Sequence, residues 1–249
     1  ADTWSDGFGI KINTERIDGF TKLGGVFGNN ESMTIGWIQS AAYHSQNSFF
    51  GTRIYDGTQK SYYSNLLYQW NPGLSKHSID AGISYKYDLY DEKLDALPVG
   101  REESVPGIFV QYTYTDSAKM TAIAGMRVDF HNLFGTLYTP RFHLRYVISP
   151  GVTLRFSAGK GFRAGNILAE NTFLLASSRN MVISGDLDIE EAWNTGLSLT
   201  ANVPVGSKVI KLAGEVFRTN FLSQIITDMD ADVNEVRFYN LDGKSFSNV

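Results

Sequence analysis

The sequence predicts an all-β protein whose sheet has two unlike faces. Apolar and polar side chains alternate from Ser78 to Asp88, and a period of two is the mark of a β-strand. Aromatic residues make up 13% of the 249 residues, but no segment offers the roughly 18 consecutive apolar residues of a transmembrane helix. Two architectures fit this composition: a membrane barrel, in which only every second residue meets lipid, and a large soluble β-sandwich or barrel.

The most informative stretch runs from Pro140 to Gly161 and predicts a hairpin with a tight turn at Ser149-Pro150-Gly151. One face of this hairpin is apolar, and the other carries Arg141, Arg145 and Arg155. The arginine face must be hydrated or ion-paired, whereas the apolar face packs on a core or meets lipid. The same pattern predicts the remaining strands in order: Gly9 to Phe27, Ser32 to Tyr43, Gln59 to Trp70, Ser78 to Asp88, Pro106 to Thr115, Lys119 to Phe130, a short one at Met181 to Ser184, Glu191 to Val203, Lys208 to Thr219, and one beginning at Val236.

The predicted connections alternate between short and long. The short ones are turns rich in Gly, Pro, Asn and Asp, and the long ones are His44 to Thr58, Leu89 to Ser104, His131 to Thr139, Phe162 to Glu190 and Asn220 to Glu235. A soluble sandwich has no reason to place every long connection at one end. An outer-membrane barrel does, because its turns are short on the periplasmic side and its loops are long outside. This order favours the membrane barrel.

The composition excludes several classes of function. A net charge of -4 argues against a nucleic-acid-binding protein. The absence of cysteine rules out disulfides and thiolate metal sites, and it is compatible with a protein of the cell envelope. The four histidines are scattered along the chain and form no Ser-His-Asp or His-x-x-x-His pattern, so we predict neither an enzyme nor a bound cofactor.

Three groups of residues are candidates for binding. The aromatic pair Phe49 and Phe50 falls in a predicted loop and can stack on a ligand ring, although packing within the loop is the more ordinary explanation. Four arginines are predicted to face the lumen, where they hold an internal domain, attract an anion or simply line a solvated wall: Arg127, Arg141, Arg145 and Arg155. Alternating carboxylates in an acidic loop suggest a weak calcium site, with a solvated loop as the alternative: Asp228, Asp230 and Asp232.

The blocks PRFHLRYVISPGVTLRFSAGKGFRAGN, LDIEEAWNTGLSL and FYNLDGKSFSN resemble TonB-dependent outer-membrane receptors, in a form similar to those of Bacteroidetes-type bacteria. Leu187, Trp193, Asn194 and Asn240 fit the later motifs, while Gly165 stands where the family usually has proline. The resemblance implies a 22-stranded transmembrane barrel with short periplasmic turns and long extracellular loops, closed by a plug domain. Residues 1–249 then correspond to a partial barrel of about eleven antiparallel strands, and we expect the plug to be absent.

The resemblance also implies a function and a location. An intact receptor of this kind lies in the outer membrane of a Gram-negative bacterium and imports a scarce, large solute, such as a ferric siderophore, haem or cobalamin. Its partners are outer-membrane lipid, a TonB-type energy transducer that acts through the plug, a small-molecule or metal-chelate ligand and a surface lipoprotein. The alternatives are a passive porin or adhesin-like barrel and a soluble carbohydrate-binding β-domain.

Overall fold

The computed structural model describes residues 8–28, 32–72, 76–95, 97–117, 119–183, 187–242 and 246–248. These residues form one sheet, in which consecutive strands pair from β1 to β8 and the order then runs β8-β10-β11-β12-β9, with β13 beside β11. The elements are β1 (Ile10–Phe27), β2 (Met33–Phe50), β3 (Arg53–Trp70), β4 (His77–Leu94), β5 (Leu97–Asp116), β6 (Met120–His131), β7 (Gly135–Ser149), β8 (Val152–Arg163), α1 (Ile167–Glu170), η2 (Thr172–Ala176), β9 (Asn180–Ile183), β10 (Glu190–Val205), β11 (Lys208–Asp228), β12 (Glu235–Asp242) and β13 (Phe246–Asn248).

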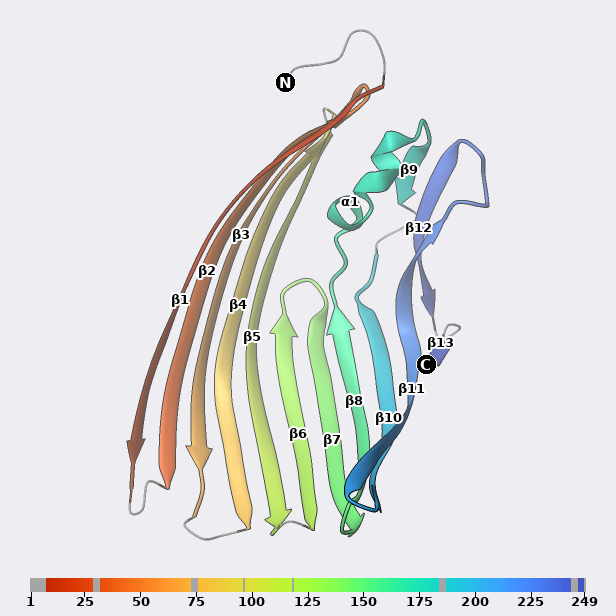
Figure 1. Cartoon of the computed structure of the whole chain (residues 1–249). Coiled ribbons are helices and arrows are strands. Elements are labelled where there is room, and N and C mark those ends of the chain that lie inside the picture. The colour runs from red at the N-terminus through yellow and green to blue at the C-terminus, as the bar shows by residue number, and fades with distance from the viewer. Residues whose placement is uncertain are drawn as a thin grey trace.

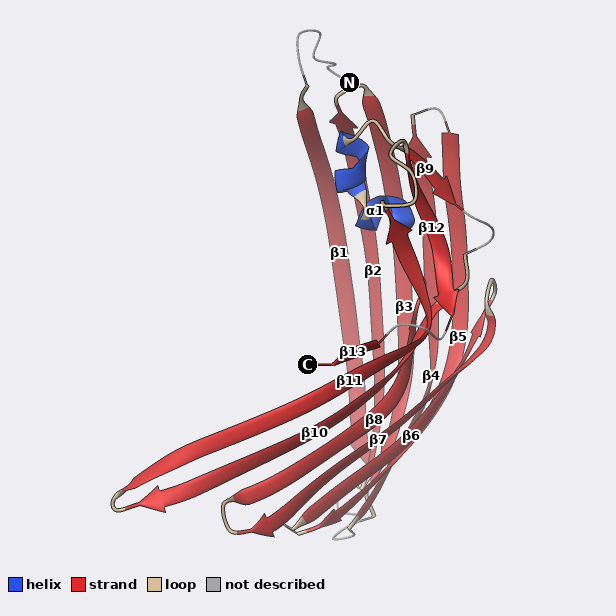
Figure 2. Ribbon diagram, turned by 90° about the vertical axis from the view of Figure 1, so that its right-hand side faces the viewer, coloured by secondary structure: helices blue, strands red, loops and turns tan. Residues whose placement is uncertain are grey.

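The sheet curves into a trough, with β1 at one edge and the β10–β11 hairpin near the other (Figures 1 and 2). Thirteen strands belong to the described part of the sheet, against about eleven expected. The expectation of antiparallel pairing throughout is wrong at one place, because β9 runs parallel to β12, from Asn180 opposite Glu235 to Ile183 opposite Phe238. This parallel pair lies at the end of the sheet. β9 belongs to the long connection between β8 and β10, and it pairs with the later strand β12.

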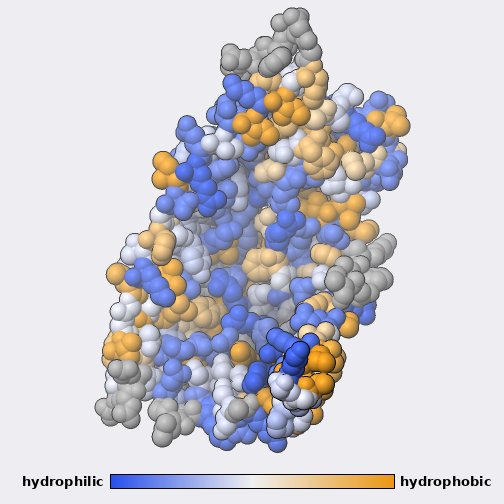
Figure 3. All heavy atoms as spheres, in the orientation of Figure 1, coloured by the Kyte–Doolittle hydropathy of each residue, from blue (hydrophilic) through white to orange (hydrophobic). Residues whose placement is uncertain are grey.

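The convex face of the trough is apolar in a continuous row. Strand register places Leu23, Trp37, Leu66 and Ile83 side by side across β1 to β4, and the row goes on through Ile108, Val128 and Tyr138 to β7. Ile83 is 58% exposed and Ile108 is 51% exposed. A patch of this extent is not left to water by a soluble protein, so the face is suited to lipid. The concave face, seen in Figure 3, is hydrophilic over most of its hollow.

Four of the five predicted long loops are wholly or partly strand. β7 begins at Gly135, within His131 to Thr139, and β11 runs to Asp228, within Asn220 to Glu235. The other two are closed hairpins. β2 continues to Phe50 and pairs residue by residue with β3 from Arg53, so His44 to Thr58 is a hairpin that turns tightly at Gly51. β4 and β5 likewise pair up to Leu94 and Leu97, within the region predicted as the loop Leu89 to Ser104. Positive φ angles of 63° at Gly51 and 57° at Asp95 match the left-handed conformation that tight hairpin turns require.

The physical reason lies in the length of these strands. β4 has 18 residues and β5 has 20, whereas about 9–11 residues cross a bilayer. The rest of each hairpin exceeds that length, and there the connection after β8 covers one face, where buried polar groups such as Glu92 stand beside apolar ones, so the apolar alternation is lost. Backbone pairing continues there without its sequence pattern, which is why composition alone indicates a loop.

The connection after β8 folds onto the upper ends of these strands. α1 and η2 place Leu168 and Leu175 against Phe50 and Tyr55 in one buried cluster. A second cluster joins Leu174 to Val236 and Phe238 of β12. The predicted loop Phe162 to Glu190 therefore contains a small core of its own, and it connects the tall hairpins to the far end of the sheet (Figure 1).

Candidate functional site

The candidate site is the concave wall, whose upper part holds a network of buried ions. The side chains of Asp88, Glu103 and Asp129 are each 2% exposed, and they come from three neighbouring strands, β4, β5 and β6. Carboxylates buried to this degree must be paired. Since strands β4 to β6 lie side by side in register, the sheet itself brings these three acids to one region.

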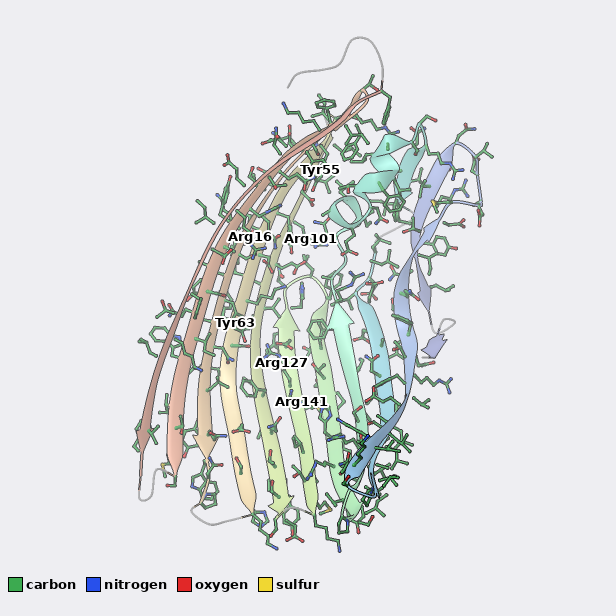
Figure 4. The ribbon with its side chains drawn as sticks, in the orientation of Figure 1. Arg16, Tyr55, Tyr63, Arg101, Arg127 and Arg141 are labelled. Carbon is green, nitrogen blue, oxygen red and sulfur yellow. The ribbon has the colours of Figure 1, made fainter. Side chains whose placement is uncertain are left out.

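Each buried acid has a basic partner within the wall. Lys86 Nζ lies 2.8 Å from Asp88 Oδ2, and Arg101 Nε lies 2.9 Å from Glu103 Oε1. Arg127 donates to both carboxylate oxygens of Asp129, at 2.7 Å from Nε and 2.5 Å from Nη2. Three acids and three bases are thus paired within this part of the wall, and the Arg127–Asp129 pair is bidentate. Arg101, Arg127 and Arg141 follow one another down the middle of the sheet (Figure 4).

A second polar group fixes the connection after β8 to the tall hairpins. Tyr55 donates to Glu92 Oε1 at 2.5 Å, and Asn166 Nδ2 donates to the same carboxylate at 3.1 and 3.2 Å. Burial, with a further contribution from Glu92, raises the pKa of the Tyr55 hydroxyl, so Tyr55 stays a hydrogen-bond donor. Asn166 also caps α1 by accepting from Ala169 N. Arg101 Nη1 completes the attachment by donating to the carbonyl of Gly165 at 2.6 Å.

The four predicted arginines share one face of the sheet, as strand register requires, but their surroundings differ. Arg127 is engaged with Asp129 and Ser84. Arg141 donates to Gln111 Oε1 at 2.5 Å, and Gln111 Nε2 in turn donates to Asp80 Oδ2 at 2.9 Å. The remaining two, Arg145 and Arg155, are directly opposite each other on β7 and β8. Their role in holding an internal domain or an anion stays a prediction.

The aromatic pair does not lie where the sequence suggests. Phe49 and Phe50 are each 4% exposed, and they end a strand instead of occupying a loop. Phe50 packs in the cluster with Tyr55, Leu168 and Leu175. Neither ring is open to a ligand in this conformation, and the stacking role that depended on the loop loses its basis.

The acidic residues near the end of β11 accept hydrogen bonds from nearby backbone amides. Asp228 Oδ1 accepts from the amides of Asp230 and Ala231 at 3.0 and 3.1 Å, and these donors lower the pKa of the Asp228 carboxyl. Asp232 Oδ1 similarly accepts from Asn234 N at 2.8 Å. Within the described ranges, no group of three or more metal-ligating side chains has the geometry to hold a metal ion. The three carboxylates predicted as a calcium site are therefore not brought together.

The motif residues after β8 join neighbouring strands. Arg163 forms ion pairs with Glu170 and with Glu190 at the start of β10. Glu190 Oε1 accepts from Ile225 N of β11 at 3.0 Å. Asn240 donates to Ser223 Oγ and to the carbonyl of Asp188. These motif residues therefore hold neighbouring strands together. Residues 243–245 of the motif lie outside the described residues.

The most buried part of the site has no apolar sequence pattern. Tyr55, Glu92, Arg101 and Glu103 all fall in segments predicted as loops, as does the buried His131, whose Nε2 lies 3.8 Å from Glu103 Oε2. A signal was present in Tyr87 to Glu103, where Asp88, Tyr90 and Glu92 keep the period of two in polar residues. A pattern search based on apolar residues does not detect it.

A curved sheet with an apolar convex face and an ion-paired concave face is part of a barrel wall. A family model described as TonB dependent receptor-like, beta-barrel matches residues 2–248. The chain therefore belongs to the TonB-dependent receptor β-barrel family. No curated protein matches the sequence. None of the helices within the described ranges has the length and apolarity needed to span a membrane.

Solved structures share the fold at low sequence identity. The siderophore receptor PirA from Pseudomonas aeruginosa is 11% identical with a TM-score of 0.55, and the match covers 94% of this chain and 58% of that one. The alcaligin outer-membrane receptor FauA from Bordetella pertussis is 15% identical with a TM-score of 0.60, with coverages of 94% and 42%. The RagAB peptide importer is 10% identical with a TM-score of 0.54, with coverages of 96% and 33%. This chain thus spans between 33% and 58% of these three chains, and the likeness concerns the fold alone.

Proposed function

We propose that this chain forms part of the barrel wall of an outer-membrane receptor that imports a large, scarce solute with energy from a TonB-type transducer. The convex face lies in the lipid of the outer membrane of a Gram-negative bacterium, and the concave face lines the lumen. Membership of the TonB-dependent receptor family supports this assignment over a soluble carbohydrate-binding domain.

The observation that carries the proposal is the contrast between the two faces. The row from Leu23 to Tyr138 offers seven apolar side chains in register to lipid. On the other face, Asp88, Glu103 and Asp129 are buried in ion pairs. A wall of this kind separates hydrocarbon from a polar interior, which is what a transport barrel requires.

The cargo we propose is a large metal chelate of the siderophore type. Two of the structurally similar proteins are described as a siderophore receptor and an alcaligin receptor, which supports this class. A peptide is the second candidate, because the RagAB importer shares the fold to a similar degree. A surface lipoprotein that covers the tall hairpins would be a further partner.

Uptake measurements in cells test the function. A strain that lacks the intact protein should accumulate less radiolabelled ferric siderophore under iron limitation than the complemented strain, with labelled oligopeptides as the parallel substrate. Collapse of the proton gradient should abolish the difference between the strains. A difference that persists without the gradient would indicate a passive porin, and no difference with any cargo would contradict import.

A further inference from the structure

The convex face carries a groove among the large side chains of its first three strands. Its floor is formed by Gly19 of β1 and Ala41 of β2, which lie opposite each other in the ladder. Both are an even number of positions from Leu23 and Trp37 of the apolar row, so they share its convex face. A Cβ atom added at Gly19 would meet nothing within 4 Å, which shows that the space above the floor is open. The cavity has a volume of about 700 Å³.

Other side chains of the same face surround this floor. Tyr62 of β3 lies opposite Ala41 and borders the cavity. The remaining convex residues that line it belong to the rows directly above and below the floor: Ile17, Tyr43, Lys60, Thr21 and Gln39. Asp18 also borders the cavity, but its carboxylate lies 3.0 Å from Arg16 Nε, and strand alternation places both residues on the concave face. Lys60 is therefore the charged side chain that lines the groove on the convex face.

The depth of the groove places its floor in hydrocarbon and Lys60 at the membrane surface. Lys60 lies ten residues from the lower end of β3 at Trp70, whereas Gly19 and Ala41 lie eight residues from the lower ends of β1 and β2. At about 3.3 Å per residue and a tilt of about 40°, these heights are about 25 Å and about 20 Å. The apolar band is about 25 Å tall. The acyl chain and the headgroup of a lipid in the outer leaflet occupy these two levels.

The acids around Lys60 leave its ammonium group available. Asp91 is in the next row of the ladder, and Glu102 is two strands away, where it is hydrogen-bonded to Tyr87. Within the described ranges, Lys60 forms no ion pair with either acid or with any other side chain. A lysine at a membrane surface attracts anionic headgroups, so the charge of the groove matches an anionic lipid.

We propose that the groove binds one anionic lipid of the outer leaflet, with an acyl chain along Gly19 and Ala41 and a phosphate group at Lys60. The lysine ammonium is a compact charge that donates to phosphate oxygens. The rings of Tyr43 and Tyr62 flank it near the interface, where amphipathic rings are favoured. The proposal rests on the proposed function in one respect, because the convex face must lie in the outer membrane.

Two lipids that differ only in their phosphate test the headgroup site. The intact protein in detergent is titrated with phosphatidic acid and, separately, with diacylglycerol of identical chains, and bound lipid is measured by native mass spectrometry. Phosphatidic acid should bind more tightly, and Lys60→Gln should weaken its binding about fivefold, the effect of one lysine near an anionic lipid surface. The control Lys22→Gln, on the concave face of β1, should change it less than twofold. Equal binding of the two lipids, or equal weakening in the two variants, would overturn the site.

The acyl-chain part of the proposal has a test of its own. Ala41→Phe fills the groove and should reduce the binding of both lipids at least fivefold. Ala124→Phe adds the same ring to the convex face of β6, outside the groove, and should leave binding unchanged. If Ala41→Phe also binds both lipids as the wild type does, the groove is not the site.

Photocrosslinking distinguishes a lipid from a polypeptide in the groove. β1 is the edge strand of the described sheet, so a neighbouring polypeptide is the alternative occupant. With p-benzoylphenylalanine in place of Tyr62 in native outer membranes, an adduct with the mass of a phosphate-bearing lipid supports the proposal, and an adduct with a polypeptide overturns it. Loss of lipid binding in a protein that still imports its cargo would refute the lipid site alone, whereas absence of import in the wild type would refute the proposed function.

Discussion

The substitution Ile83→Arg tests the placement of the convex face in lipid. Ile83 is 58% exposed and lies six residues from the lower end of β4 at His77. At about 3.3 Å per residue and a tilt of about 40°, it stands about 15 Å above that end, near the middle of an apolar band about 25 Å tall. Its neighbours in the row, Leu66 and Ile108, offer no counter-charge. An arginine at the bilayer midplane costs about 2–4 kcal/mol, so we expect the free energy of unfolding to fall by that amount.

The matched control is Ser40→Arg on the concave face. Ser40 lies seven residues from the lower end of β2 at Met33, so its height is similar, and it borders a cavity of about 350 Å³ together with Asp88. Unfolding by urea in lipid vesicles, followed by tryptophan fluorescence, should show a loss for Ile83→Arg and a much smaller change for Ser40→Arg. Equal losses for the two variants, or none for Ile83→Arg, would refute the assignment of the faces.

Two further predictions concern the outer segments. Leu175 is 1% exposed, so Leu175→Ala should destabilise the α1–η2 segment by about 2–5 kcal/mol and speed its limited proteolysis, whereas Phe173→Ala, at a residue 60% exposed, should not. The pKa of Asp228 is lowered by its backbone donors, so it stabilises the turn after β11 at neutral pH, and this contribution is lost as the pH falls through the lowered pKa. Amide exchange in residues 229–234, corrected for intrinsic rates, should be faster in Asp228→Asn than in wild type at pH 7 but similar at low pH, and Asp230→Asn should match wild type throughout.

The sequence predicts the membrane part of the fold well because lipid imposes a pattern on it. From Ile79 to Tyr87 every second side chain meets hydrocarbon, and the strand found there agrees with the prediction. Above this part, the covered face of the hairpin extensions holds polar groups such as Glu92 beside Phe50, so the extensions leave no apolar alternation in the sequence. Their existence depends on backbone pairing with neighbouring strands.

The site was less predictable than the fold because it depends on register. The period of two places Arg127 and Asp129 on the polar face, but the hydrogen bond from Arg127 to Ser84 requires β4, β5 and β6 to align at one level. The opposition of Arg145 and Arg155 likewise follows from the register of β7 and β8, which neither strand's own pattern sets. Packing of the connection after β8 onto Glu92 joins residues 74 positions apart, which no local pattern indicates.

Cysteine labelling at two adjacent positions tests the central claim most directly. The chain has no cysteine, so Ser198→Cys and Leu199→Cys each introduce a single thiol. Leu199 is 46% exposed on the convex face, and Ser198 borders a cavity of about 540 Å³ on the concave face. In native outer membranes, a lipid-soluble maleimide should label Leu199→Cys and a charged, water-soluble reagent should label Ser198→Cys. Reversed labelling, or equal reaction of both thiols with the charged reagent, would contradict a barrel wall between lipid and lumen.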